Sequence, residues 1–217
     1  MDFTAARHNM VESQIKPNRV TDPLVIRALA DLPREAFVPE TLEGIAYVDE
    51  AIHIGSARYM MEPMVLARLL QAAEVEPDDV ALVIGCGSGY EAAVMSALTT
   101  AVVALESDKG FFDESTATLA ELGFDAIAVV DGPDLARGYQ RQAPYDVIFI
   151  NGAIPEIPER IAGQLAEGGR LVAIVGSGSM GKGTLMTRFN GVLTSREVFD
   201  AGTPPLPGFE MAEAFSF

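Results

Sequence analysis

Several residue types on which particular protein classes depend are scarce in this sequence. Its 217 residues include one cysteine, Cys86, two histidines and no tryptophan. One cysteine cannot form an internal disulfide, and so few histidines and cysteines provide no cluster at metal-ligand spacing. We therefore expect neither a disulfide framework nor a bound metal.

Basic residues and long apolar runs are scarce as well. Fifteen Lys and Arg stand against 31 Asp and Glu, which gives a net charge of −16. This charge repels phosphate backbones and offers no counterion release, so we expect no nucleic-acid partner. No apolar stretch reaches the ~20 residues of a membrane span, and the first residues lack the apolar core of a secretory signal. We expect no membrane partner and a cytoplasmic location, and the oligomeric state stays open.

Apolar residues are abundant, at 49% of the chain, which is enough for one substantial core. We interpret residues 1–217 as a single domain with a helical, acceptor-side region at 1–76 and an α/β core at 77–217. In the first region, residues 23–32 and 63–74 open on proline and continue with apolar residues at helical spacing. These two segments are predicted helices.

From residue 80 the chain alternates short apolar runs with helical segments. Near-continuous apolarity is typical of parallel strands buried on both faces. The predicted strands are 80–84, 101–105, 126–130, 146–150 and 170–175, and the predicted helices between them are 89–98, 111–122 and 158–166. Two later runs, 184–189 and 197–199, predict an antiparallel pair. The fold class is therefore α/β with a mostly parallel sheet.

A glycine-rich turn follows the first of these strands. Gly85, Gly87 and Gly89 form a G-x-G-x-G pattern, in which glycine permits positive φ and lets a ligand approach the backbone. Glu106 ends the next strand, and a carboxylate at this offset can accept both hydroxyl protons of a ribose. Dinucleotide sites place their third glycine one residue later, at the position of Tyr90. The spacing therefore favours S-adenosylmethionine over NAD.

Eight short motifs occur in a fixed order between residues 9 and 172. They are NMVESQ at 9–14, PREAFVP at 33–39, AYVD at 46–49, GSGYEAAV at 87–94, APYD at 143–146, IP at 157–158, QL at 164–165 and GGRLV at 168–172. Together they resemble the protein-L-isoaspartate O-methyltransferase family.

The resemblance implies a class I methyltransferase (Rossmann-like) fold: a mostly parallel seven-stranded sheet, an N-terminal helical extension and an antiparallel C-terminal strand pair. It implies S-adenosyl-L-methionine as cofactor and S-adenosylhomocysteine as product. It also implies methyl transfer to the carboxylate of isoaspartyl residues, which starts protein repair. The partner is then a peptide or protein carboxylate acceptor.

The sequence departs from this family on the acceptor side. Where the family has a Thr-Ile-Ser-type segment between a glycine and a proline, residues 55–63 read GSARYMMEP, which is two residues longer. Arg58 and Tyr59 are the acceptor-side candidates, because a guanidinium can pair with a carboxylate bidentately. The alternative is a solvated Arg58 and a Tyr59 packed beside methionines. An altered acceptor stays open, and so does a non-catalytic, binding or regulatory descendant of the family.

A second departure precedes the glycine turn. Val83 stands where many members of this fold place an acid, and Glu91 is either its substitute or a solvated acid of the first helical turn. Asn151 follows a predicted strand and either orients an acceptor or forms a turn. The proline-rich run at 203–209 either caps the site or links strands. The predicted cofactor-binding residues are Gly85, Cys86, Gly87, Ser88, Gly89, Glu106, Ser107, Asp131, Gly132 and Asn151.

Overall fold

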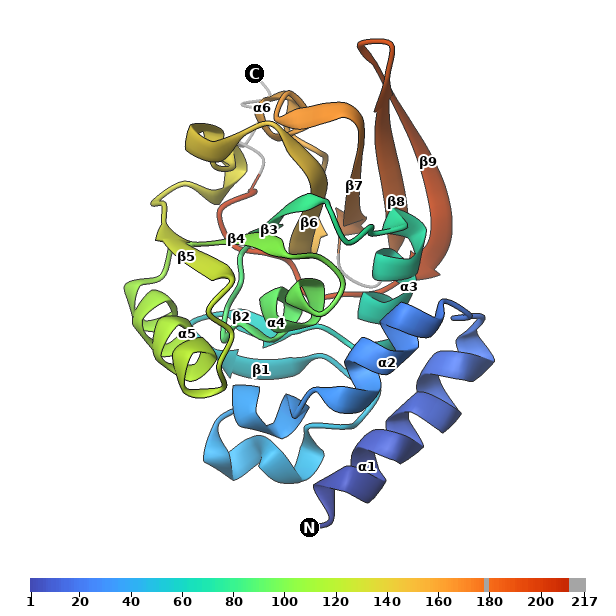
Figure 1. Ribbon diagram of the computed structural model, residues 1–217, viewed down its shortest axis with the longest axis vertical. Helices are drawn as coiled ribbons and strands as arrows, with labels where there is room; N and C mark the ends of the chain where they lie inside the picture. Colours follow the sequence, from blue (N-terminus) through green and yellow to red (C-terminus); the bar gives the residue numbers. More distant parts are fainter. Residues whose placement is uncertain (178–179, 211–217) are drawn as a thin grey trace, which may run out of the picture.

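The computed structural model describes residues 1–177 and 180–210. At its centre is a seven-stranded sheet with the strand order β5-β4-β3-β6-β7-β8-β9 (Figure 1). Strands β3 to β7 are parallel, and β8 and β9 are antiparallel to their neighbours. The strands are β3 (Val80–Ile84), β4 (Ala101–Glu106), β5 (Ile127–Asp131), β6 (Tyr145–Ile154), β7 (Leu165–Ser177), β8 (Met180–Phe189) and β9 (Val192–Ala201).

The order of the strands reverses beside β3. The chain builds outward from β3 through β4 to β5 and then returns to place β6 on the other side of β3. In open α/β sheets, ligands bind outside the carboxyl ends of the strands at such a switch point. The ends of β3, β4 and β6 are therefore the place to look for a site.

Alpha-helices and shorter helical segments connect the strands and precede the sheet. The α-helices are α1 (Phe3–Met10), α2 (Pro23–Asp31), α3 (Pro63–Ala73), α4 (Tyr90–Ser96), α5 (Lys109–Glu121) and α6 (Glu159–Ala162). Short segments of other helix types lie at Val11–Ile15, Lys16–Asn18, Arg34–Phe37, Glu40–Ile45, Leu135–Arg137 and Gln140–Gln142. No helix in the described part of the chain is long and apolar enough to cross a membrane.

Successive residues of each central strand contribute to two different cores. Ala81 and Val83 of β3 belong to a large cluster that also contains residues of α2, α3 and α4. Leu82 and Ile84 belong to a smaller cluster on the opposite face, with Ile161 of α6. This two-residue alternation follows from the strand geometry, which points neighbouring side chains to opposite faces. The near-continuous apolarity of the run is therefore explained by burial on both faces.

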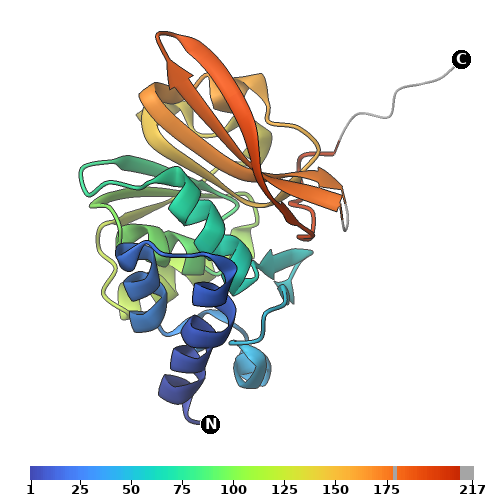
Figure 2. The same ribbon diagram turned by 90° about the vertical axis from the view of Figure 1, so that its right-hand side faces the viewer.

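A small two-stranded sheet precedes α3. It consists of β1 (Ile52–Gly55) and β2 (Arg58–Met60), which pair antiparallel across a turn in which Ser56 and Ala57 have φ of 44° and 55°. We call β1 and β2 the hairpin. It lies next to residues 203–209, which we call the strap and which follow β9 (Figure 2).

The strap is joined to β6 by backbone hydrogen bonds. The Ala153 amide donates to the Pro204 carbonyl at 2.9 Å, and the Leu206 amide donates to the Ala153 carbonyl at 2.8 Å. Beyond the last strand of the sheet, the strap therefore returns to the centre and covers the end of β6. It caps this edge and does not link strands.

The predicted fold class is confirmed, whereas some boundaries were wrong. The helix expected at 158–166 is limited to α6, because the chain joins the sheet at once: the Tyr145 amide donates to the Gln164 carbonyl at 2.9 Å, and β7 begins at Leu165. Strands β6 and β7 are longer than the apolar runs that predicted them. The single-domain interpretation stays a prediction.

Candidate active site

The glycine loop, residues 85–89, is curled over the end of β4. Gly85, Gly87 and Gly89 have φ of 75°, 54° and 99°, values that L-residues with a side chain rarely adopt. The amides of Gly85 and Cys86 both donate to the Leu105 carbonyl, at 2.8 and 3.1 Å. The glycine pattern therefore serves backbone geometry, as the sequence predicts.

Glu106 orders this loop from the end of β4. Its side chain is fully buried, and its Oε2 accepts a hydrogen bond of 2.8 Å from the Gly87 amide. Its Oε1 accepts from the amides of Ser107 and Asp108 at 2.7 and 2.9 Å. These three hydrogen bonds fix both carboxylate oxygens in place. The Glu106 carboxylate thus lies between the loop and the start of α5.

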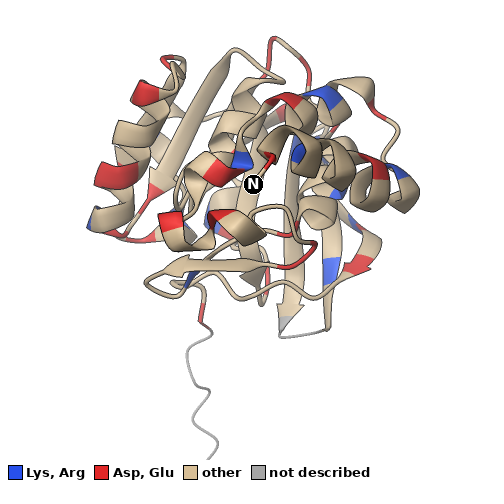
Figure 3. Cartoon of the chain, turned by 90° about the horizontal axis from the view of Figure 1, so that it is seen from below, with Lys and Arg blue, Asp and Glu red and all other residues tan. Residues whose placement is uncertain are grey.

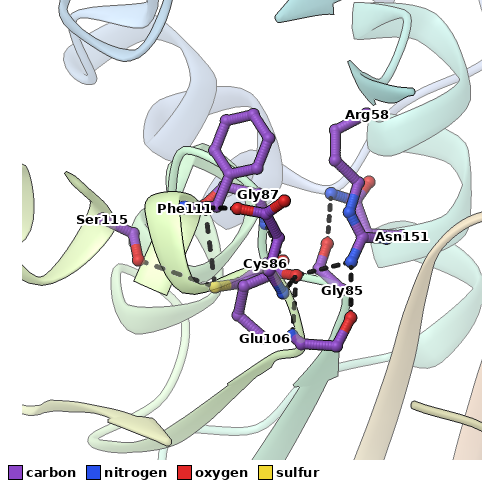
Figure 4. A network of polar contacts seen from close by, with 10 residues as sticks. Arg58, Gly85, Cys86, Gly87, Glu106, Phe111, Ser115 and Asn151 are labelled. Atoms are coloured by element: carbon purple, nitrogen blue, oxygen red, sulfur yellow. Dashed lines mark hydrogen bonds and ion pairs between the residues drawn. The ribbon is translucent and has the colours of Figure 1, made fainter. Parts of the chain in front are cut away.

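Arg58 lies against Glu106, although the two residues are far apart in sequence (Figure 4). Its Nη2 is 2.5 Å from Glu106 Oε1 and 3.1 Å from Ser107 Oγ. Arg58 is only 4% exposed, whereas Tyr59 is 37% exposed and packs on His53 with ring centroids 5.0 Å apart. The alternation along β2 explains this arrangement. The interpretation of a solvated Arg58 beside a packed Tyr59 was therefore wrong.

Asn151 lies inside β6, and its interpretation as a turn residue was wrong. The strand continues to Ile154, and the buried Asn151 side chain donates to the Gly85 carbonyl at 3.1 Å. It therefore ties the end of β6 to the glycine loop.

Three buried side-chain atoms around the loop lack a hydrogen-bond partner among the described residues. They are Arg58 Nη1, Ser88 Oγ and Asn151 Oδ1. Buried polar atoms are nearly always paired, and an unpaired one costs about 1–3 kcal/mol. Three of them around one loop indicate a polar ligand.

Glu91 is buried and not solvated, which corrects the expectation for the first turn of α4. It is 2% exposed, and its Oε1 accepts from the Met61 amide at 3.2 Å. Burial raises the pKa of Glu91 and outweighs the opposite effect of nearby Arg34. Val83, the position that lacks an acid, is fully buried in the apolar core. Glu91 thus connects the chain after the hairpin to the helix after the glycine loop.

Asp131 and Gly132 lie at the end of β5, beside Glu106. Asp131 is the last residue of β5 and pairs with Glu106 of β4, while the Gly132 amide donates to the Glu106 carbonyl at 2.9 Å. The Asp131 side chain is exposed. The structure thus places both residues at the same sheet edge as Glu106.

The thiol of Cys86 is enclosed beneath the loop. Cys86 is fully buried, with its Sγ 3.9 Å from Ser115 Oγ. Burial, together with the negative charge of Glu106, raises the pKa of this thiol far above its usual range. Cys86 is therefore a packing group and not a nucleophile.

Leu206 of the strap occupies the space directly over the glycine loop. A Cβ atom on Gly85 would lie 2.7 Å from Leu206 Cδ1, and one on Gly152 would lie 2.8 Å from Leu206 Cβ. Thr203 fixes the strap to the start of α3 by donating from Oγ1 to Glu62 Oε2 at 3.0 Å. The glycines thus provide a close approach that Leu206 fills. The sequence gives no sign of this contact beyond the proline-rich composition of residues 203–209.

Two cavities flank the strap. A small one of about 10 Å³ lies towards the loop and is lined by residues that include Arg58, Gly85 and Asn151. A larger open one of about 510 Å³ lies on the other side and is lined by Tyr59, Ala153, Pro155, Phe209 and other residues. Ala57, Tyr59 and four strap residues line both. The strap therefore divides one region into a tight inner part and a wide outer part.

Charged residues are distributed over the surface of the chain (Figure 3). Acidic positions are scattered over helices and loops in the view from below (Figure 3). Among residues 1–177 and 180–210, no group of three or more His, Cys, Asp and Glu is placed to hold a metal ion.

The sheet order and the site at the ends of β3, β4 and β6 define a Rossmann-like methyltransferase fold. A family model described as protein-L-isoaspartate(D-aspartate) O-methyltransferase (PCMT) matches residues 5–198. The chain belongs to this family.

Relatives in sequence support this assignment over most of the chain. A protein-L-isoaspartate O-methyltransferase of Methanoculleus marisnigri is 41% identical over 170 residues, covering 78% of this chain and 77% of the relative. One of Koribacter versatilis is 34% identical over 206 residues, covering 95% and 92%. The similarity therefore extends through both the helical region and the α/β core.

Solved structures agree in fold. A protein-L-isoaspartate O-methyltransferase superposes with a TM-score of 0.78 at 24% identity, covering 94% of this chain and 67% of that one. A Plasmodium falciparum β-aspartate methyltransferase (PCMT), crystallised with S-adenosyl-L-homocysteine, also gives 0.78, at 19% identity, covering 96% and 99%.

Proposed function

We propose that this protein is an S-adenosylmethionine-dependent O-methyltransferase that methylates the carboxylate of isoaspartyl residues in proteins, a repair reaction of the cytoplasm. Family membership supports the reaction class. The observation that carries the proposal for this chain is the position of the glycine loop. It lies at the switch point of the sheet, and the Glu106 carboxylate holds it by a hydrogen bond from the Gly87 amide.

The residues around the loop fit an adenosyl cofactor chemically. Glu106 has the position to accept ribose hydroxyls, and Asp131 and Gly132, which adjoin Glu106 at the same sheet edge, would face the adenine. Ser88 Oγ and Asn151 Oδ1 are buried polar atoms that would gain partners. The donor and acceptor set is therefore that of a nucleoside site with a polar tail.

The cofactor supplies a methyl group on a sulfonium, so that an acceptor oxygen gains the C–O bond as the C–S bond breaks, leaving a neutral ester and a thioether. The protein needs no strong acid or base for this transfer, because the nucleophile is already ionised. Its part is positioning and exclusion of water, which supply several kcal/mol in reactions of this type. The strap and Tyr59 lie where they would shield the reacting groups.

Room for the cofactor requires two side chains to move. The inner cavity of about 10 Å³ holds about one water molecule. Leu206 fills the space over Gly85, and the Arg58 guanidinium is hydrogen-bonded to the Glu106 carboxylate. The outer cavity has space for a peptide and is lined by Tyr59 of the hairpin, whereas the adjacent Arg58 lines the inner cavity. Cofactor binding therefore displaces the strap locally.

Two measurements on the full-length protein test this function. Calorimetric titration with S-adenosylhomocysteine should give saturable binding, and an isoaspartyl peptide should take up label from methyl-labelled S-adenosylmethionine. The same peptide with normal aspartate is the control and should stay unlabelled. Binding without methyl uptake would reject isoaspartate as acceptor, and absence of binding would reject the cofactor as well.

A further inference from the structure

Arg58 is a buried cation whose hydrogen bonds are incomplete. Its side chain is 5% exposed, and Nη2 contacts Glu106 and Ser107. Nη1 is buried and has no partner in the described part of the chain, although it belongs to a guanidinium that lines the inner cavity. A buried charged donor without a partner is costly, so its retention points to an acceptor that arrives with a ligand.

The carboxylate of Glu106 has little capacity for further donors. Oε1 accepts from Arg58 and from the amides of Ser107 and Asp108, and Oε2 accepts from the Gly87 amide. A carboxylate offers about four lone-pair sites. Ribose hydroxyls can therefore bind well only when one donor leaves. Three of the four donors are backbone amides, which leaves the Arg58 side chain as the group that can move.

A guanidinium released from Glu106 stays beside the acceptor region. Arg58 lies at the start of β2, next to Tyr59, which lines both the inner and the outer cavity. Without the Glu106 carboxylate, the buried charge of Arg58 is stabilised only by another anion. The planar guanidinium can donate two parallel hydrogen bonds to a second carboxylate. The carboxylate that enters from the outer cavity is that of the acceptor.

We propose that Arg58 is the residue that recognises the acceptor carboxylate, and that it becomes available only after the cofactor has taken its place on Glu106. This inference rests on the proposed function. It assigns to Arg58 the selection of an anionic acceptor and makes the two ligands bind with positive coupling. A ligand that releases Arg58 improves the site for the other, and by thermodynamic linkage the effect is mutual.

The coupling is measured by a closed cycle of four titrations. An isoaspartyl peptide is titrated into the protein with and without saturating S-adenosylhomocysteine, and S-adenosylhomocysteine is titrated with and without peptide. In the parent protein each ligand should tighten the other by about tenfold, within the usual range of such couplings. The same peptide as its α-methyl ester should show a coupling factor near one, since it lacks the anion. An ester that couples as strongly as the acid would overturn the proposal without any variant.

Variants separate this role from a merely structural one. Arg58→Met should bind S-adenosylhomocysteine at least as tightly as the parent, because Glu106 is freed, and its coupling factor should fall to about one. Arg58→Lys keeps the positive charge but cannot donate the two parallel hydrogen bonds of a guanidinium, so it should retain part of the coupling. Arg27→Met removes an exposed arginine of α2 and should leave the coupling unchanged.

The outcomes distinguish the two proposals. Full coupling in Arg58→Met overturns the role of Arg58 and leaves the proposed function intact. Equal weakening of both ligands in Arg58→Met, with the coupling unchanged, overturns it too and assigns Arg58 to structure. Absence of S-adenosylhomocysteine binding by the parent protein overturns the proposed function and the role of Arg58 together.

Discussion

The two sides of the site are built in different ways. On the cofactor side, the glycine loop and Glu106 come from one continuous stretch, and their contacts are largely with backbone atoms. On the acceptor side, Arg58 meets Glu106 across 48 positions, and Thr203 meets Glu62 across 141. One side is thus specified locally, and the other exists only when the whole chain is folded. The acceptor side can therefore change by substitution while the cofactor side is kept.

The largest test of this contrast is Glu106→Ala, because Glu106 belongs to both sides. The substitution leaves the Arg58 charge buried and frees three amides, so the free energy of unfolding should fall by about 3–5 kcal/mol. Urea unfolding measures it. Asp113→Ala breaks the exposed Lys109–Asp113 pair and should leave the unfolding midpoint unchanged. Equal midpoints for both variants would show that Glu106 is not needed for assembly.

Leu206→Ala tests whether the strap limits the space for the cofactor above the glycine loop. Without the side chain over Gly85, S-adenosylhomocysteine should bind about tenfold more tightly, or by about 1.4 kcal/mol, in calorimetry. Leu193→Ala, on β9, is the matched control and should not change the affinity. Weaker binding by Leu206→Ala would mean that Leu206 supports the ligand and does not displace it.

Asp131→Ala tests how far the cofactor side extends. Because Asp131 is exposed at the end of β5, its loss should weaken S-adenosylhomocysteine binding by about 0.5–1.5 kcal/mol. Calorimetry beside Asp134→Ala, an exposed acid in the following loop, gives the comparison. If the two variants bind alike, Asp131 is outside the site.

Glu91→Gln tests the connection between the two sides through pH. Burial raises the pKa of Glu91 above its ordinary 4.5, so the folded protein holds this proton more tightly than the unfolded chain. The contribution of Glu91 to stability then falls as pH rises through the raised pKa, and protonation restores it. Relative to the parent, Glu91→Gln should therefore gain stability in urea unfolding as the pH rises from 4.5 through the raised pKa of Glu91.

Two comparisons make the pH result specific to burial. Glu114→Gln, on the exposed face of α5, should show no pH-dependent difference from the parent protein. A stability of Glu91→Gln that declines over the same range, relative to the parent, would mean that Glu91 is stabilised as the ion. The pairing with Arg34 would then outweigh burial.

What the sequence could predict follows the same division. The strands, the loop glycines and the end position of Glu106 depend on local pattern, and the structure places them as expected. The burial of Arg58 and Glu91 depends on partners that are distant in sequence, and a polar residue near a turn has the same pattern whether it is buried or solvated. Leu206 was missed because an apolar residue in a proline-rich run indicates neither a partner nor a role. Helix α6 was overestimated because pairing with β6 ends it early.

The solitary cysteine gives this site a built-in reporter. Cys86 is the one thiol of the chain, and it lies fully buried inside the glycine loop with its pKa raised. A thiol reagent can therefore modify the native protein only during transient opening of the loop. The rate of modification measures how often the loop opens, with no engineered probe and no background from other thiols. Ligands that close or brace the loop can be ranked by how far they slow this reaction.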